Sequence, residues 1–439
     1  MGPMGITRGF ACYDQYSHSF GDWVKMGREI TGYKNGTGAV TSIPLSRLPH
    51  CPIIPLPPYP VLKDMRILIV TGEASGDLHG AHLAKAIMAL DPTAQLVGIG
   101  GPAMRAAKVS LVPGVPQLDV MGLIGLSAIR AMVQRVRTIR RVLKTEAWDL
   151  VVLIDNPGLN FHFARVAKAA GRRVLYYIAP QVWAWRPGRM KWIQRRVDHV
   201  VVILPFESEL YRQAGVRCTF VGHPLLDTVA PHYDRAKLRG EFGLDESSRV
   251  VGLLPGSRVS EVEMLLPVLL KAAAQLVVAE PGTQFILAQA SSIDDNLIQA
   301  LLQHSPVPVR VVHDQANEVM ALSEVLFIAS GTATLQAAVV GTPMVLLYKT
   351  SPLTYRLARW LINVKWIGLV NLVAGRSVVP ELIQDEATAE RLCQEVLHLL
   401  RDPSAYNDMK EGLRQVRQSL GEPGASSRAA QVALSECRL

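Results

Sequence analysis

Asp155 is the strongest catalytic candidate in this sequence. It follows the apolar run 148–154 and precedes Asn156-Pro157, which would end a strand. A carboxylate at the carboxyl end of a buried parallel strand can face a cleft and accept a proton from an attacking hydroxyl group. The alternative is that Asp155 only caps a helix that begins at Pro157. Its position favours the catalytic role.

Two further loops carry residue types that bind a diphosphate. Leu254-Pro-Gly-Ser-Arg258 and Ser330-Gly-Thr-Ala-Thr334 each follow an apolar run and precede a helical pattern. Arginine makes charge-assisted hydrogen bonds to phosphate oxygens, and the N–H groups of a helix N-terminus attract anions. Either loop alone could be mere capping, but two in one series favour a nucleotide diphosphate. The candidates are Ser257, Arg258, Ser330, Gly331 and Thr332.

Two segments of the first half are candidates for the acceptor side of a cleft. The loop 71–77 places Ser75, Gly76 and Asp77 ahead of a helical pattern, where backbone N–H groups can hold a polar ligand or the aspartate can simply cap the helix. The segment 180–192 interleaves tryptophans with cations, among them Arg186. That mixture is typical of phosphate binding, RNA stacking or a membrane interface, and also of tryptophans packed at a sheet edge.

A basic amphipathic helix is predicted over 123–144. Apolar residues recur there at helical spacing, and the residues between them are arginines and a lysine, without an acid before Glu146. Such a helix is typical of a membrane interface, whereas the alternative is an ordinary helix that covers a sheet. The charge of a single sign favours the membrane. The residues expected to face it are Leu123, Ile124, Leu126, Ile129, Arg130 and Met132.

The elements that must position these residues alternate between apolar strands and helices. Runs without polar alternation, such as 66–70 and 148–154, indicate parallel strands buried on both faces, and hence a doubly wound α/β sheet. The alternation restarts at Val250 after a charged bridge. We therefore expect two Rossmann-like domains facing across a cleft, over 65–240 and 241–386. The helices of 387–439 have no strand partners and either cross back over the first domain or dock on another subunit.

Residues 1–64 lack this periodicity and end in a proline-rich run, so we expect an extension or linker, with the folded unit beginning near Met65.

The 439 residues are 49% apolar and 19% charged, with net charge +9 and mean hydropathy +0.19. This composition excludes a disordered chain, and no apolar run reaches the ~18 residues of a spanning helix. The charge indicates a membrane, nucleic acid or phosphate partner. Five scattered cysteines encode neither a disulfide framework nor a zinc site, so a reducing cytoplasm is expected.

Several motifs together resemble the lipid-A-disaccharide synthase family. They occur in order and cover nearly all of 65–435. The GEASGD and PQVWAWR stretches are the most specific of them. The motifs are Gly72-Glu-Ala-Ser-Gly-Asp77, Gly100-Gly-Pro-Ala-Met104, Val120-Met-Gly122, Ile154-Asp-Asn-Pro157, Pro180-Gln-Val-Trp-Ala-Trp-Arg186, Leu204-Pro-Phe-Glu207, Val221-Gly-His-Pro224, Leu254-Pro-Gly-Ser-Arg258, Ser330-Gly-Thr332 and Asn371-Leu-Val-Ala-Gly-Arg376.

The resemblance implies an inverting glycosyltransferase of the GT-B fold. Such an enzyme transfers 2,3-diacylglucosamine from its UDP donor to 2,3-diacylglucosamine 1-phosphate and releases UDP. It needs no metal or other cofactor and is peripheral on the cytoplasmic face of the inner membrane of Gram-negative-type bacteria. Asp155 matches the family's base, UDP would lie near Arg258 and 330–332, and Asn371 and Arg376 join the cleft candidates. A homodimer stays open, and nucleic acid is not expected as a partner.

The sequence departs from the family pattern at three places. Gln336 stands where many members have glutamate, so a contact to a ribose hydroxyl has one acceptor plus donors. Gly125 and Gly158 replace acidic residues, and the second change leaves Asp155 as the only carboxylate of its loop. Two alternatives remain at this level: another GT-B enzyme, such as a UDP-GlcNAc epimerase or a different UDP-sugar transferase, and a non-enzymatic RNA- or membrane-binding module.

Overall fold

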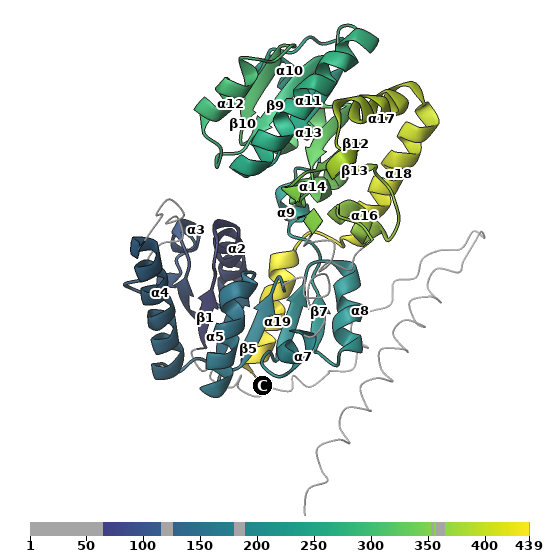
Figure 1. Ribbon diagram of the computed structural model, residues 1–439. Coiled ribbons are helices and arrows are strands. Elements are labelled where there is room, and N and C mark those ends of the chain that lie inside the picture. Colours follow the sequence, from purple (N-terminus) through teal and green to yellow (C-terminus); the bar gives the residue numbers. More distant parts are fainter. Residues whose placement is uncertain (1–64, 116–125, 180–188, 353–354, 357–364, 439) are drawn as a thin grey trace, which may run out of the picture. The chain divides into compact units, whose positions relative to one another are not determined.

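The computed structural model describes residues 65–115, 126–179, 189–352, 355–356 and 365–438 (Figure 1). For 126–129 the description extends to the helical backbone alone. The expected N-terminal extension, 1–64, lies outside the described residues.

The first half of the chain forms a seven-stranded parallel sheet. Its strand order is β3-β2-β1-β4-β5-β6-β7. Apart from the partly buried Arg66 at the start of β1, the central strands β1, β4 and β5 are buried and consist of aliphatic and tyrosine side chains, as expected for strands covered on both faces. The strands are β1 (Arg66–Val70), β2 (Gln95–Ile99), β3 (Ser110–Leu111), β4 (Leu150–Ile154), β5 (Val174–Tyr177), β6 (His199–Val202) and β7 (Cys218–Phe220).

Helices cover both faces of this sheet. One face packs against α2 (Ala74–Leu90), α3 (Pro102–Ala106) and the last helix of the chain, α19 (Ala425–Cys437). The other face packs against α4 (Leu126–Thr145), α5 (Pro157–Ala169), α7 (Arg189–Gln194) and α8 (Pro205–Gln213). The expectation of a doubly wound α/β sheet is confirmed.

The second sheet repeats this order with six parallel strands, β10-β9-β8-β11-β12-β13. They are β8 (Val250–Leu254), β9 (Gln284–Gln289), β10 (Val309–His313), β11 (Val325–Ala329), β12 (Met344–Tyr348) and β13 (Glu381–Ile383). The helices that follow β7 and accompany this sheet are α9 (Leu225–Thr228), α10 (Arg235–Phe242), α11 (Val259–Ala279), α12 (Asp295–Leu302), α13 (Ala316–Leu322), α14 (Thr332–Val340), α16 (Leu369–Ala374), α17 (Ala389–Arg401) and α18 (Pro403–Ser419), with a short 3-10 turn at Gln384–Glu386.

Each sheet reverses its winding direction at its first and fourth strands, β1 and β4 in one sheet and β8 and β11 in the other. Ligands of doubly wound sheets bind beyond the carboxyl ends of the strands at such a switch point. The candidate loops 71–77 and 155–157 follow one pair of strands, and 255–258 and 330–332 follow the other. The topology therefore brings the candidate loops together in pairs.

The C-terminal helices divide between the two sheets. Helices α17 and α18 bury apolar residues in the core of the second sheet, whereas α19 contributes Ala429, Ala430, Ala433 and Leu434 to the core of the first. Figure 1 shows α19, drawn in yellow, lying against the first sheet. Of the two alternatives for these helices, crossing back over the first sheet is the one that α19 adopts.

A buried ion cluster anchors α19. The carboxylate of Glu436 lies 2.7 Å from Nη2 of Arg173, 2.8 Å from Nη1 of Arg217 and 2.9 Å from Nδ1 of His199. The Glu436 side chain is almost fully buried, whereas both arginines keep part of their surface in solvent. The chain end is thus tied to strands more than two hundred residues earlier in the sequence.

Among the described helices, α11 is the one long and apolar enough to cross a membrane by length and composition. Its residues Val262, Leu265, Leu266 and Leu269 are buried in the core of the second sheet. Its apolar character is explained by that packing.

Candidate active site

Asp155 lies at the end of β4 in a strained backbone conformation. Asp155 and Asn156 both have positive φ angles, +48° and +42°. Non-glycine residues rarely adopt this region, and such conformations cluster at functional sites. Two side chains hold the turn: Asn160 Nδ2 donates to the carbonyl oxygens of Asp155 (2.7 Å) and Ile154 (2.9 Å), and Tyr176 Oη donates to that of Asp155 (2.8 Å). The carbonyl of Asp155 is therefore fixed from two elements.

The capping alternative for Asp155 does not hold. The N-cap of α5 is Asn156, whose Oδ1 accepts a hydrogen bond from the N–H of Leu159 at 3.4 Å. Because Asn156 serves the helix, the carboxylate of Asp155 is left for other chemistry.

The loop after β1 approaches Asn156 closely at Gly72. A Cβ on Gly72 would lie 1.8 Å from Nδ2 of Asn156, so only glycine fits there. This contact brings the start of α2, with the exposed Ser75, next to the turn that carries Asp155.

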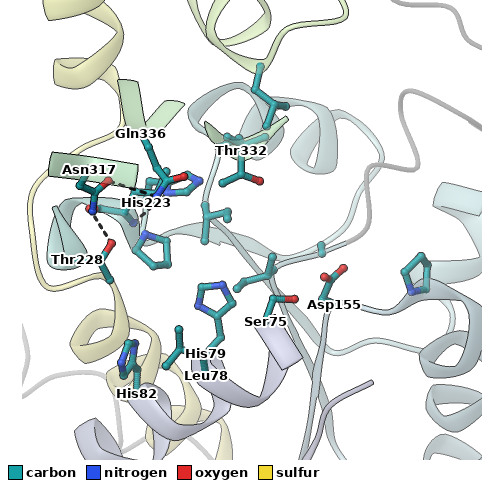
Figure 2. Close-up of a pocket in the computed structure, with 18 of the residues that line it drawn as sticks. Ser75, Leu78, His79, His82, Asp155, His223, Thr228, Asn317, Thr332 and Gln336 are labelled. Atoms are coloured by element: carbon teal, nitrogen blue, oxygen red, sulfur yellow. Dashed lines mark hydrogen bonds between the residues drawn. The ribbon is translucent and has the colours of Figure 1, made fainter. Parts of the chain in front are cut away.

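Asp155 faces a cavity of about 1020 Å³. Figure 2 shows Ser75, Asp155, His79 and His223 on its wall. Residues that follow strands of the second sheet, among them Asn317, Thr332 and Gln336, also line it, together with apolar side chains that include Leu78, Ile203, Leu204 and Leu225. The cavity thus joins a carboxylate to an otherwise largely apolar wall.

The pKa of Asp155 is raised above its ordinary value. Burial is the main cause, and the negative charge of Glu73 adds to it, while the backbone N–H of Asn156 acts in the opposite direction. In its ionised form, a carboxylate whose pKa is raised is a stronger base than an ordinary one.

A second cavity of about 420 Å³ lies at the switch point of the second sheet. The six donor-side candidates all line it: Ser257, Arg258, Ser330, Gly331, Thr332 and Gln336. Arg258 is largely exposed and pairs with Glu261 Oε1 at 2.9 Å. The N-termini of α11 and α14 both lie at this cavity, because Arg258 and Gly331 are their N-cap residues.

Gln336 lines both cavities. Its Nε2 lies 3.4 Å from Oδ1 of Asn317, which orients the amide and leaves Oε1 as the acceptor for a ligand hydroxyl. Thr332 also lines both cavities. These two residues therefore mark where the cavities meet.

Contrary to the prediction, Asp77 does not face the cavity. It is buried, and its carboxylate accepts hydrogen bonds from the N–H groups of Gly101 (2.6 Å), Ala103 (2.8 Å) and Met104 (3.2 Å). It therefore holds the start of α3, and Gly76 beside it is also buried. The physical reason is that a buried carboxylate has to satisfy its own oxygens, and this loop offers three donors.

Asn371 and Arg376 are also placed elsewhere. Asn371 is fully buried and bonds the backbone of Val378 and Val379 and the carboxylate of Glu381. Arg376 is exposed and donates to Gln415 at 3.0 Å. Neither lines the two cavities; Asn371 instead holds the loop before β13.

Helix α4 covers the first sheet with one side and exposes apolar and basic side chains on the other. Ile139, Val142 and Leu143 are buried against the first sheet, whereas Met132 and Val133 are exposed. Arg130 is exposed, but Arg135 is buried and donates to the carbonyl of Thr71 at 2.9 Å, so the cations do not all face solvent. Of the other candidates, Leu123, Ile124 and Arg186 lie outside the described residues, as do the side chains of Leu126 and Ile129.

His79 and His223 were missed by the sequence analysis. Both line the larger cavity. His79 stands four residues after Ser75, on the same face of α2, and this spacing was the available signal. His223 belongs to the motif 221–224, which carries no chemical signature of its own. Among the described residues, no group of three or more His, Cys, Asp or Glu side chains could hold a metal ion.

Comparison with known proteins identifies the family. A family model described as Lipid-A-disaccharide synthetase matches residues 67–435. A lipid-A-disaccharide synthase of Geobacter metallireducens is 48% identical over 372 residues, covering 84% of this chain and 97% of that protein. One of Coxiella burnetii is 38% identical over 372 residues, covering 84% and 98%.

Solved structures show the same fold at low identity. UDP-GlcNAc 2-epimerase from Neisseria meningitidis, bound to UDP-GlcNAc, has a TM-score of 0.58 at 14% identity and covers 84% of this chain and 100% of that chain. The calicheamicin glycosyltransferase CalG4 has a TM-score of 0.54 at 16% identity and covers 85% and 98%. These likenesses concern the fold, whereas the family model and the relatives exclude a non-enzymatic module. The chain belongs to the lipid-A-disaccharide synthase family and is a glycosyltransferase of the GT-B fold.

Proposed function

We propose that this chain transfers 2,3-diacylglucosamine from UDP-2,3-diacylglucosamine to 2,3-diacylglucosamine 1-phosphate. The products are the β-1,6-linked disaccharide 1-phosphate and UDP. The observation that carries the proposal is the placement of Asp155: a carboxylate with a raised pKa, free of capping duty, on the wall of a cavity that meets the diphosphate-type cavity at Thr332 and Gln336.

In this reaction Asp155 is the base. Its carboxylate takes the proton of the acceptor's 6-hydroxyl group while that oxygen attacks the anomeric carbon of the donor sugar. The bond between the anomeric carbon and the UDP oxygen breaks, and UDP leaves with the electron pair. Attack from the side opposite the leaving group inverts the anomeric centre, so one carboxylate is sufficient.

The second cavity would hold the leaving diphosphate. Arg258 supplies a permanent positive charge, and the N-terminus of α14 supplies backbone donors beside Ser330 and Thr332. Both stabilise negative charge as it develops on the leaving oxygen. The Oε1 of Gln336 can accept a hydrogen bond from a ribose hydroxyl.

We also propose that α4 binds anionic lipid, which would hold the enzyme on the cytoplasmic face of the inner membrane. Met132 and Val133 are exposed apolar side chains on this helix. The exposed cations around them are Arg130, Arg137, Arg140, Arg141 and Lys144. Apolar insertion and attraction to anionic headgroups add in such a helix.

The decisive experiment is Asp155→Asn in the transfer assay, with the disaccharide detected by mass spectrometry. We expect turnover to fall by about 10²–10⁴-fold, the usual contribution of a general base. UDP binding, measured by calorimetry, should be unchanged because Asp155 does not line the second cavity. Asp408→Asn, an exposed carboxylate on α18, is the control. Near-normal turnover of the Asp155 variant would remove Asp155 as the base.

A further inference from the structure

Three histidines line the larger cavity, His79, His82 and His223, and the proposed mechanism uses none of them. His79 lies on α2, and His223 lies between β7 and α9. They are close enough for charge on His79 to disfavour charge on His223. Figure 2 shows both rings on the wall that also carries Ser75 and Asp155. All four residues accompany the first sheet, so their arrangement belongs to one half of the fold.

The hydrogen-bonding state of His223 is set by its own loop. The N–H of Leu225 donates to Nδ1 of His223 at 3.1 Å, so Nδ1 is an acceptor. In the neutral ring the proton is then on Nε2. His223 is buried and therefore presents one oriented N–H donor, Nε2–H.

One ring nitrogen of His79 has no hydrogen-bond partner among the described residues. This atom, Nδ1, is buried. Buried polar atoms in native proteins almost always have a partner, so an orphan on a cavity wall indicates a ligand or an ordered water. Together, the two rings offer one donor and one unfilled position.

The ligand group that fits is uncharged. Burial lowers the pKa of both His79 and His223 to about 4, with a smaller contribution from a neighbouring histidine in each case, so both rings are neutral at pH 7. Apolar side chains of Leu78, Leu204 and Leu225 line the same cavity. A phosphate would need a cation, which these neutral rings do not supply. Among the described lining residues, Arg189 is the only one with a permanent positive charge.

We propose that His79 and His223 bind the 2-acylamido group of the amino sugar whose hydroxyl Asp155 deprotonates. Nε2–H of His223 donates to the amide carbonyl, and the amide N–H donates to Nδ1 of His79. The apolar wall then accommodates the start of the acyl chain. An ester in the same place would accept the first hydrogen bond but could not make the second, because it has no N–H. The identity of the sugar rests on the proposed function.

The test compares two soluble probes, N-hexanoylglucosamine 1-phosphate and 2-O-hexanoylglucose 1-phosphate. They differ only at C2, where the first carries an amide N–H and the second an ester oxygen. Their affinities for the full chain are measured by calorimetry at pH 7. We expect the wild type to bind the amide about tenfold more tightly, the effect of one hydrogen bond. His79→Phe should bring amide affinity down to the ester's level, whereas His79→Asn, which keeps a polar atom near the Nδ1 position, should restore part of the preference.

The matched control is His162→Phe. His162 lies on α5, away from the cavity, and its Nε2 is also buried without a partner among the described residues. This variant should keep the tenfold preference. The proposal is overturned if the wild type does not distinguish the probes, if His79→Phe keeps the preference, or if His162→Phe loses it equally. UDP affinity checks that each variant is folded.

The transfer assay separates this proposal from the proposed function. If wild-type protein prefers the amide probe but forms no disaccharide from the diacylated substrates, the subsite stands and the proposed reaction fails. If disaccharide forms but the amide preference is absent, the reaction stands and the subsite fails.

Discussion

The side-chain amide of Asn160 holds the carbonyl oxygen of Asp155 at 2.7 Å. Asn160 is buried one helical turn into α5, and the same Nδ2 also donates to Ile154. The bond therefore opposes relaxation of the left-handed turn at Asp155 toward the extended backbone that a non-glycine residue prefers. Through this turn, Asn160 sets where the Asp155 carboxylate points.

Replacing Asn160 should misplace the base without removing it. For Asn160→Leu we expect kcat to fall about 10–100-fold, since a misplacement of about 1 Å can cost 10²-fold. The KM for the donor should be unchanged. Tyr176→Phe removes the other hydrogen bond to the same carbonyl and should have a smaller effect, because Asn160 remains. Steady-state kinetics with each variant checks this; a variant that raised KM at unchanged kcat would contradict the positioning role.

The negative charge of Glu73 should influence the pH at which kcat/KM falls on the acidic side of its pH profile. Its negative charge raises the pKa of Asp155, second to burial in size among the raising effects. A base works above its pKa, so kcat/KM falls as the pH drops through that pKa. Glu73→Gln removes the like charge and lowers the pKa, and this acidic limb should move to lower pH by less than one unit.

The measurement is kcat/KM between pH 4 and pH 8. Glu246→Gln, an exposed carboxylate before β8, serves as the control and should leave the limb in place. A limb that moved to higher pH in Glu73→Gln would contradict the assignment of this titration to Asp155.

The position of Asp155 was predictable, but what holds it was not. The run 148–154 predicted a strand buried on both faces, which the structure has at Leu150–Ile154, and the polar residue after it had to lie at the ligand edge of the sheet. The φ angles at Asp155 and Asn156 depend on contacts from Tyr176 and Gly72, which are distant in sequence. Local pattern carries no information about such contacts.

The wrong assignments have a related cause. Asp77 and Asn371 have the residue types of ligand-binding groups, and these same types satisfy buried backbone. Sequence reasoning cannot distinguish the two uses without knowing burial.

The short strands β3, β7 and β13 were not predicted, because two or three residues are too few to show periodicity. Most of the segment 235–246, interpreted as a charged bridge, forms the helix α10, which Asp234 caps and whose Leu238 and Phe242 pack against the core of the second sheet.

Loss of the Glu436 carboxylate should destabilise the protein. Glu436→Ala leaves Arg173, Arg217 and His199 without their shared anion, and breaking a buried ion pair costs about 3 kcal/mol. Urea unfolding at pH 7 should show a lower midpoint. Glu395→Ala, which removes an ion pair within α17, should cost less than about 0.5 kcal/mol because its partner Arg391 is exposed.

The same cluster predicts acid sensitivity. Burial alone would raise the pKa of Glu436, but hydrogen bonds from His199 and Arg173 and the charge of Arg217 outweigh it, so the pKa is lowered. A carboxyl whose folded-state pKa is depressed contributes stability above its unfolded pKa, about 4.3, and loses it as the pH falls further. The stability difference between wild type and Glu436→Gln should therefore shrink below about pH 4.3. A difference that stayed constant from pH 7 to pH 3 would exclude the titration of Glu436 as the cause.

Helix α4 should bind anionic vesicles through its exposed apolar residues. Met132 and Val133 are 47% and 40% exposed, and inserting both would bury side chains worth about 1.5–3 kcal/mol each when fully removed from water. The double variant Met132→Ser, Val133→Ser should therefore bind phosphatidylglycerol vesicles at least tenfold more weakly in a sedimentation assay. Val278→Ser, at an 83% exposed apolar position on α11, should bind as the wild type does.

Charge and apolar contact can be separated in the same assay. Raising the salt concentration screens the attraction of the arginines for anionic lipid but leaves apolar insertion in place. Because the double variant keeps all the cations, salt should weaken both proteins by a similar factor, and the variant should stay at least tenfold weaker than the wild type at every salt concentration. If both proteins bound equally at every salt concentration, α4 would not be the membrane-contacting helix, and its exposed cations would have to be assigned to another partner.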